Sequence, residues 1–171
     1  MGLFDRAGLP REEFRSLGES VAGRVWVLAW ARGPAGPVVG LAGRLAVRTP
    51  VGWRFVGWHQ IDSGGWDAAS GRLHWTLIGG GADEVVLEAP GSLPDLFRER
   101  VGASIVLQER FEMSRGRAAI IVARRRLDDD QAPLVWSVTR QGGDFDASQI
   151  ERAGDELARL RAEYDIATEV W

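Results

Sequence analysis

The first half of the chain is divided into short apolar segments, which follow one another at a spacing of roughly ten residues and are separated by glycine or proline. Alternation of apolar with other residues indicates β-strands, and clusters of glycine and proline mark the turns between them. We therefore expect strands, in chain order, at 24–32, 38–48, 53–61, 72–78 and 85–88. Short strands repeated at this spacing predict a β-sandwich or a small β-barrel.

Three glycines and the composition of the segment 53–61 add detail to these predicted strands. Gly40 and Gly43 interrupt the segment 38–48, and we interpret them as bulges or as points of close contact with another part of the chain. Gly71 ends a tight turn before the strand at 72–78, and we expect it in the left-handed conformation that glycine adopts easily. Neither alternating set in 53–61 is cleanly polar, so neither face of this strand is predicted to be exposed.

Three further segments have helical spacing. The first, at 9–18, carries Pro10 near its start and acidic residues in its first turn. The second runs from Ser92 to about residue 110, although the β-branched residues at 104–107 also allow a strand to begin there. The third starts near residue 146, with Ser148 and Glu151 as its expected capping box and an apolar stripe along one face. Strands at 117–126 and 133–140 precede it as a predicted hairpin.

Composition excludes several classes of protein. The 171 residues suit one domain, or one domain with a small appendix, and the absence of cysteine excludes thiol nucleophiles, disulfides and cysteine-ligated metals. A formal charge of −3 gives no general attraction to nucleic acid or to anionic membranes. No apolar run reaches the length of a membrane span and the start of the chain has no signal-peptide core. We expect a soluble, cytoplasmic protein without a nucleic-acid partner or a membrane span.

The block that runs from Trp58-His59-Gln60-Ile61 through Trp66-Asp67 and Ser70-Gly71 to Leu73-His74-Trp75 is similar to bacterial members of the pleckstrin-homology-like superfold. With an N-terminal Leu-Pro helix and the segment 90–108, the chain also resembles a family of uncharacterised actinobacterial proteins. The resemblance implies an α+β fold, in which a pleckstrin-homology-like antiparallel β meander or barrel is capped by an amphipathic helix. An N-terminal helix precedes this domain, and a C-terminal β-hairpin plus helix follows it. The expected divisions are 1–22, 23–112 and 113–171, the last packed as an extension of the same domain. The resemblance implies no reaction and no cofactor.

Trp58, His59 and His74 are the candidate contacts for a ligand or a partner. His59 and His74 lie on segments predicted to be adjacent strands, so they could form a metal or acid-base site if an aspartate completed it. The alternative is two half-buried histidines packed among tryptophans, which in strands are more often core residues than binding residues. No catalytic, cofactor-binding or metal-binding residue is assigned.

Two arginine patterns remain. Phosphoinositide binding in the wider superfold relies on a basic loop between the first two strands, and the corresponding loop at 31–38 contains Arg32 alone, so we do not expect it. The run 124–126 is basic and the run 128–130 is acidic. These charges lie within a Debye length of about 8 Å, so a self-compensated hairpin tip is the better interpretation.

The sequence thus favours a non-catalytic interaction module that binds a protein partner, and it leaves a homo-oligomer open. The alternative is a small-molecule-binding protein or enzyme that uses a cavity between sheet and helix, with His59 and His74 as its polar groups. The two hypotheses differ in one structural requirement: the second needs His59 and His74 in the same cavity, and the first does not.

Overall fold

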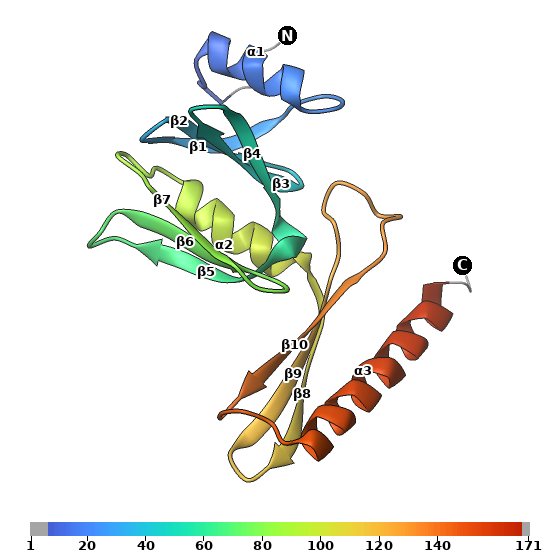
Figure 1. Ribbon diagram of the computed structural model, residues 1–171. Helices are drawn as coiled ribbons and strands as arrows, with labels where there is room; N and C mark the ends of the chain where they lie inside the picture. The colour runs from blue at the N-terminus through green and yellow to red at the C-terminus, as the bar shows by residue number, and fades with distance from the viewer. Residues whose placement is uncertain (1–6, 169–171) are drawn as a thin grey trace. The chain divides into compact units, whose positions relative to one another are not determined.

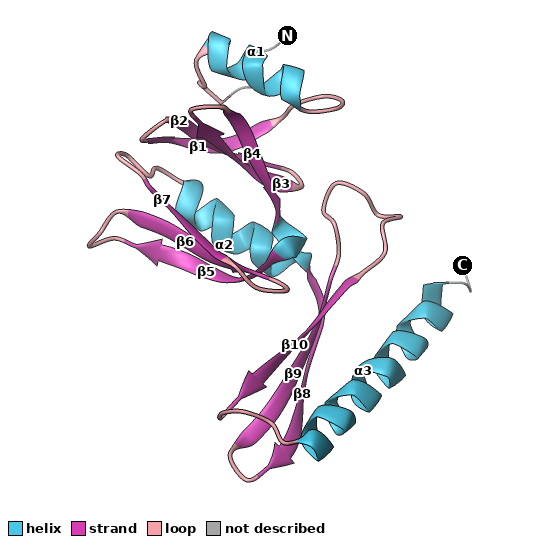
Figure 2. Ribbon diagram, in the orientation of Figure 1, coloured by secondary structure: helices cyan, strands magenta, loops and turns pink. Residues whose placement is uncertain are grey.

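The computed structural model describes residues 7–168, and its contacts divide the chain into two compact units (Figures 1 and 2). Unit 1 consists of the described residues up to Ser104 together with Arg125–Val135. Unit 2 consists of Ile105–Arg124 and the described residues from Trp136 onward. The described part of the chain is a mixed α+β fold, with three sheets and three α-helices.

Unit 1 contains two antiparallel sheets in which neighbouring strands are consecutive along the chain. The four-stranded sheet is formed by β1 (Val27–Gly33), β2 (Gly36–Leu41), β3 (Arg44–Thr49) and β4 (Gly52–Gly57). The three-stranded sheet is formed by β5 (Ile61–Asp67), β6 (Arg72–Leu77) and β7 (Ala82–Val86). Gly71 has a φ of 65°, which confirms the predicted turn before β6.

Two predicted strands are each divided in the structure. The segment predicted as a single strand at 38–48 is the hairpin of β2 and β3, and the chain reverses at residues 42–43. The strand predicted at 53–61 ends at Gly57, where a short 3-10 helix, η2 (Trp58–Gln60), leads into β5. The backbone N–H of Trp58 donates to the carbonyl of Gly43 over 3.2 Å, so the two breaks in the strand pattern are joined to each other.

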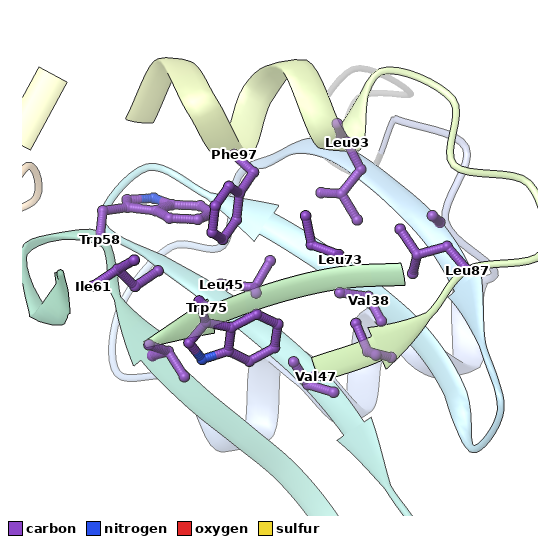
Figure 3. Close-up of a cluster of buried hydrophobic side chains, with 14 residues drawn as sticks. Val38, Leu45, Val47, Trp58, Ile61, Leu73, Trp75, Leu87, Leu93 and Phe97 are labelled. Atoms are coloured by element: carbon purple, nitrogen blue, oxygen red, sulfur yellow. The ribbon is translucent and has the colours of Figure 1, made fainter. Parts of the chain in front are cut away.

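The four-stranded sheet is covered on both faces, as the lack of a polar face in 53–61 predicted. On one face, α1 (Arg11–Ser20) buries Leu17 against Val39, Leu41 and Ala46. On the other face, α2 (Leu93–Ser104) buries Leu93 and Phe97 in a cluster that also contains residues of the three-stranded sheet (Figure 3). The members of this cluster labelled in Figure 3 are Val38, Leu45, Val47, Trp58, Ile61, Leu73, Trp75, Leu87, Leu93 and Phe97.

Gly40 and Gly43 are positions of close contact, as predicted. A Cβ atom at Gly40 would overlap the side chain of Leu96 on α2, and one at Gly43 would overlap the side chain of Asp128. Each glycine therefore allows another segment of unit 1 to lie directly against the backbone of the four-stranded sheet.

In unit 2, β8 (Ile105–Ser114) and β9 (Arg117–Arg124) pair as antiparallel strands, and β10 (Val135–Gln141) lies beside β9, as the predicted hairpin requires. The helix predicted to reach about residue 110 ends at Ser104, and the β-branched residues that follow begin β8, which pairs with β9. The division predicted at residue 112 falls inside β8.

The last helix, α3 (Ala147–Thr168), begins near residue 146 as predicted, but its cap is formed by other residues than expected. The reciprocal hydrogen bonds join Asp146 and Gln149: the N–H of Gln149 donates to Asp146 Oδ1 over 2.9 Å, and the N–H of Asp146 donates to Gln149 Oε1 over 3.1 Å. The predicted box of Ser148 and Glu151 is therefore wrong by two residues, since aspartate caps a helix as well as serine does. The predicted apolar stripe is confirmed in part: Ala153 and Leu160 are buried, Ala153 in a cluster with residues of β8 and β9, whereas Ile150 is exposed.

Candidate functional site

A polar pocket of about 220 Å³ lies within unit 1 and brings together residues far apart in the sequence. The lining side chains come from β3, β4, η2 and the segment that follows β9: Arg44, Phe55, His59, Gln60, Arg126 and Asp128. Gly43 and Gly57 complete the wall. The hairpin at 42–43 and the 3-10 turn that ends β4 thus create this pocket, and they are the two places where the simple strand pattern fails.

Asp128 pairs with both arginines of this pocket. Its Oδ1 atom accepts a hydrogen bond from Arg126 Nε over 3.0 Å. Its Oδ2 atom accepts one from Arg126 Nη2 over 3.2 Å and one from Arg44 Nη2 over 2.8 Å. The guanidinium of Arg126 therefore binds the carboxylate through two nitrogens, which is the geometry that arginine favours with carboxylates.

This pairing fixes the charge of Asp128. Partial burial acts to raise the pKa of the carboxyl group, but the hydrogen bonds from Arg126 and Arg44 outweigh it and lower that pKa to about 2. Asp128 is therefore ionised at neutral pH. Its side chain keeps 23% of its surface exposed, so the pair is accessible to solvent.

His59 forms another wall of the pocket. Its ring lies against Gly57, where a Cβ atom would overlap it, and the N–H of Gly57 donates to Gln60 Oε1 over 2.8 Å. Within residues 7–168, His59 Nδ1 has no hydrogen-bond partner. Burial, followed by the positive charge of Arg126, lowers the pKa of His59 below 6.5, while Asp128 acts in the opposite direction. The imidazole is therefore mostly neutral at neutral pH.

The lowered pKa of His59 predicts a loss of stability in mild acid. Because the folded protein holds the proton more weakly than the unfolded chain, this contribution to stability is complete above pH 6.5 and is lost as the pH falls through the folded pKa. We expect the melting temperature to fall as the pH is lowered below 6.5, and to fall less in His59→Gln. Thermal unfolding of both proteins tests this, and an equal fall in both would contradict it.

His74 lies elsewhere in unit 1. It is exposed on β6, opposite Gly65 of β5 and Glu84 of β7, whereas its neighbours Leu73 and Trp75 point into the core. His59 lines the pocket and His74 does not, so the structure does not bring the two histidines into one pocket. Among the described residues, no group of three histidine, aspartate or glutamate side chains is placed to hold a metal ion.

Trp58 belongs to the core. Its side chain has no exposed surface, and its indole N–H donates to the carbonyl of Leu41 over 2.9 Å. Its ring and that of Phe97 are packed in a T-shaped arrangement with their centroids 5.9 Å apart. In this structure Trp58 packs the interior and has no surface to offer a partner. The space between the sheets and α2 is filled by this cluster (Figure 3).

Of the polar side chains that form the pocket, the sequence identified only His59 as a candidate site residue. The charges of the basic run at 124–126 and the acidic run at 128–130 were expected to compensate each other. Arg126 does pair with Asp128, and its Nη1 atom lies 3.7 Å from Asp129 Oδ2. The partner missing from that interpretation is Arg44, which is 84 positions from Asp128 in the chain. The one local signal was Gly43, which was interpreted as a bulge or a point of close contact, without an indication of what contacts it.

Comparisons with known proteins give no relatives from which to transfer a function. No family model, no curated protein and no solved structure matches the chain. In the part of the chain that the structure describes, no helix is long and apolar enough to cross a membrane.

Proposed function

We propose that the protein is a non-catalytic interaction module, that unit 1 is a pleckstrin-homology-like domain, and that a protein partner binds at the pocket of Arg44, His59 and Arg126. The fold assignment is supported by consecutive antiparallel strands in two sheets, with α2 packed against their shared core. The observation that carries the function is the pocket, where two partly exposed arginines stand beside the aromatic side chain of Phe55. Arginine and aromatic side chains are the residues that most often anchor a protein partner.

The chemistry of the pocket favours binding over catalysis. A carboxyl group with a pKa of about 2 is a poor proton donor or acceptor at neutral pH, because general acid-base catalysis works best with a pKa near the working pH. The pKa of His59 is lowered, first by burial and then by Arg126, and its Nδ1 atom has no orienting partner in the described residues. Both groups are suited to contact a ligand.

The second candidate is a small-molecule-binding protein that uses the same pocket. The pocket's volume of about 220 Å³ favours a protein partner over a small molecule, since pockets for whole drug-sized ligands usually measure about 300–1,000 Å³. A pocket of this size accommodates one side chain or one chain end of a larger partner. An enzyme that uses both His59 and His74 would need them in one site, and His74 does not line this pocket.

The proposal predicts a partner whose binding depends on Arg44. The tagged full-length protein, captured from cells of its source organism, is compared with Arg44→Gln. We expect the partner to bind Arg44→Gln at least about tenfold more weakly, which corresponds to about 1.4 kcal/mol. Quantitative mass spectrometry of the captured proteins measures this difference.

Arg98→Gln provides the matched control. Arg98 lies on α2 with 82% of its side chain exposed, it pairs with the exposed Asp95, and it does not line the pocket. This variant should recover as much partner as the wild type. Recovery that is equal in all three proteins would contradict the proposal, and a bound metabolite that requires Arg44, without any protein partner, would support the second candidate instead.

A further inference from the structure

The arginine pocket already holds a carboxylate of its own. We propose that the ligand group recognised by this pocket is a carboxylate, from an acidic side chain or a chain end of the partner, and that Asp128 is an internal competitor that occupies its position. This inference rests on the proposed function, because it names the chemistry and the regulation of the same pocket. Four observations within unit 1 support it.

The first observation is the geometry of the two arginines. Arg126 offers Nε and Nη2 to separate oxygens of Asp128, and Arg44 adds Nη2 to one of those oxygens. Two parallel N–H donors match the planar, two-oxygen shape of a carboxylate. A ligand carboxylate could accept hydrogen bonds from the same three donors only in the position that the Asp128 carboxylate now occupies.

The second observation is the space made for this carboxylate. A Cβ atom at Gly43 would overlap both the Cγ and the Oδ2 atoms of Asp128, so the carboxylate lies directly against the backbone between β2 and β3. The bare backbone thus makes room for a carboxylate rather than for a bulkier group. This fit supports a specific site over a chance pairing on the surface.

The third observation is how the competitor is held. The preceding residue, Leu127, packs against the core cluster of unit 1, and the N–H of Arg125 donates to the carbonyl of Ser104 over 2.8 Å. Asp128 is therefore tethered beside the arginines, which gives it a high effective concentration there. An external carboxylate must compete with this tethered group.

The fourth observation is that the competitor can be displaced. The side chains of Arg44, Arg126 and Asp128 are exposed to 34%, 36% and 23%, so water screens the pair and a dissolved carboxylate can reach the arginines. Two arginines face Asp128 and the nearby Asp129, so the charges already balance and a second anion beside Asp128 gains little. A ligand carboxylate therefore gains most by replacing Asp128.

Removal of the internal carboxylate tests this directly. In Asp128→Gly, we expect sodium acetate to raise the melting temperature of the full chain by about 2–4 °C more than sodium chloride at equal ionic strength. The wild type should show no such difference, because Asp128 fills the position. Adding Arg126→Gln to Asp128→Gly should abolish the acetate effect.

Three results would overturn the inference. The inference is wrong if acetate and chloride give Asp128→Gly the same melting temperature, if the acetate effect survives the addition of Arg126→Gln, or if inorganic phosphate stabilises Asp128→Gly more than acetate does. Phosphate is included because two arginines also bind phosphate groups. The last result would assign the pocket to a different anion.

Asp128→Asn extends the test to the partner and does not depend on the folding of Asp128→Gly. An amide keeps the shape of the side chain but loses its charge, so it competes less well for the arginines. We expect Asp128→Asn to capture the partner several-fold more strongly than the wild type. If capture requires Arg44 but is not strengthened in Asp128→Asn, competition is wrong and the proposed function stands. If acetate stabilises Asp128→Gly as expected but no partner depends on Arg44, the carboxylate site stands and the proposed function is wrong.

Discussion

Replacement of Phe97 by alanine is expected to lower the free energy of unfolding by about 3–5 kcal/mol. Phe97 lies on α2 with 2% of its surface exposed, and its ring centroid is 5.9 Å from that of Trp58 and 6.3 Å from that of Trp75. The variant therefore loses the buried apolar surface of the ring and leaves a cavity between residues of both sheets of unit 1. Urea unfolding followed by tryptophan fluorescence measures the effect.

The matched control for this prediction is Arg98→Ala, on the residue next to Phe97. Its side chain is 82% exposed, so the change should alter the free energy of unfolding by no more than about 0.5 kcal/mol. A cost below about 1 kcal/mol for Phe97→Ala would mean that the cluster in Figure 3 does not hold α2 against the sheets.

The sequence predicted the strands of unit 1 well where turns carry glycine in its special conformation. The turn at Gly71, which has a positive φ, is indicated by both the periodicity and the composition of the sequence. The hairpin at residues 42–43 carries a weaker signal, since Gly43 does not have a positive φ and the flanking strands are apolar on both faces. When both faces of a sheet are buried, alternation disappears, and a hairpin can resemble one long strand.

The end of α2 also depends on contacts that the local sequence does not show. The apolar spacing of α2 continues past Ser104, yet the chain becomes β8 at Ile105. A run of β-branched residues is compatible with either structure, and pairing with β9 decides the outcome. Tertiary contacts of this kind cannot be predicted from the local sequence.

The candidate site was predicted only in part. His59 was identified and does line the pocket, whereas His74 faces solvent on β6 and Trp58 is a core residue. The signal that drew attention to these residues was the gathering of three tryptophans and both histidines of the chain within residues 56–75. The pocket depends instead on Arg44 and Asp128, whose residue types are common here and whose contact spans 84 positions. A single sequence carries no record of such a pair.

The second large effect is expected from Gly43→Ala. The added methyl group would overlap Asp128, and the backbone conformation at Gly43 is not left-handed, so the collision is the main consequence. Forced overpacking of this kind typically costs about 1–3 kcal/mol. Because Asp128 would be displaced from Arg44 and Arg126, its pKa should rise from about 2 toward the ordinary 3.8. Urea unfolding measures the first effect, and NMR titration of the Asp128 carboxyl group measures the second.

A double-mutant cycle separates this collision from any other effect of alanine in the hairpin. In Asp128→Gly the carboxylate that obstructs the methyl group is absent, so Gly43→Ala should cost much less in this background, with a coupling of about 0.5–3 kcal/mol. The same cycle bears on the carboxylate site, because the methyl group would also occupy the space that acetate needs. The double variant should therefore lose the specific stabilisation by acetate that Asp128→Gly alone is expected to show. Additive costs in the cycle would mean that Gly43 is needed for the hairpin itself, and that room for a carboxylate is incidental.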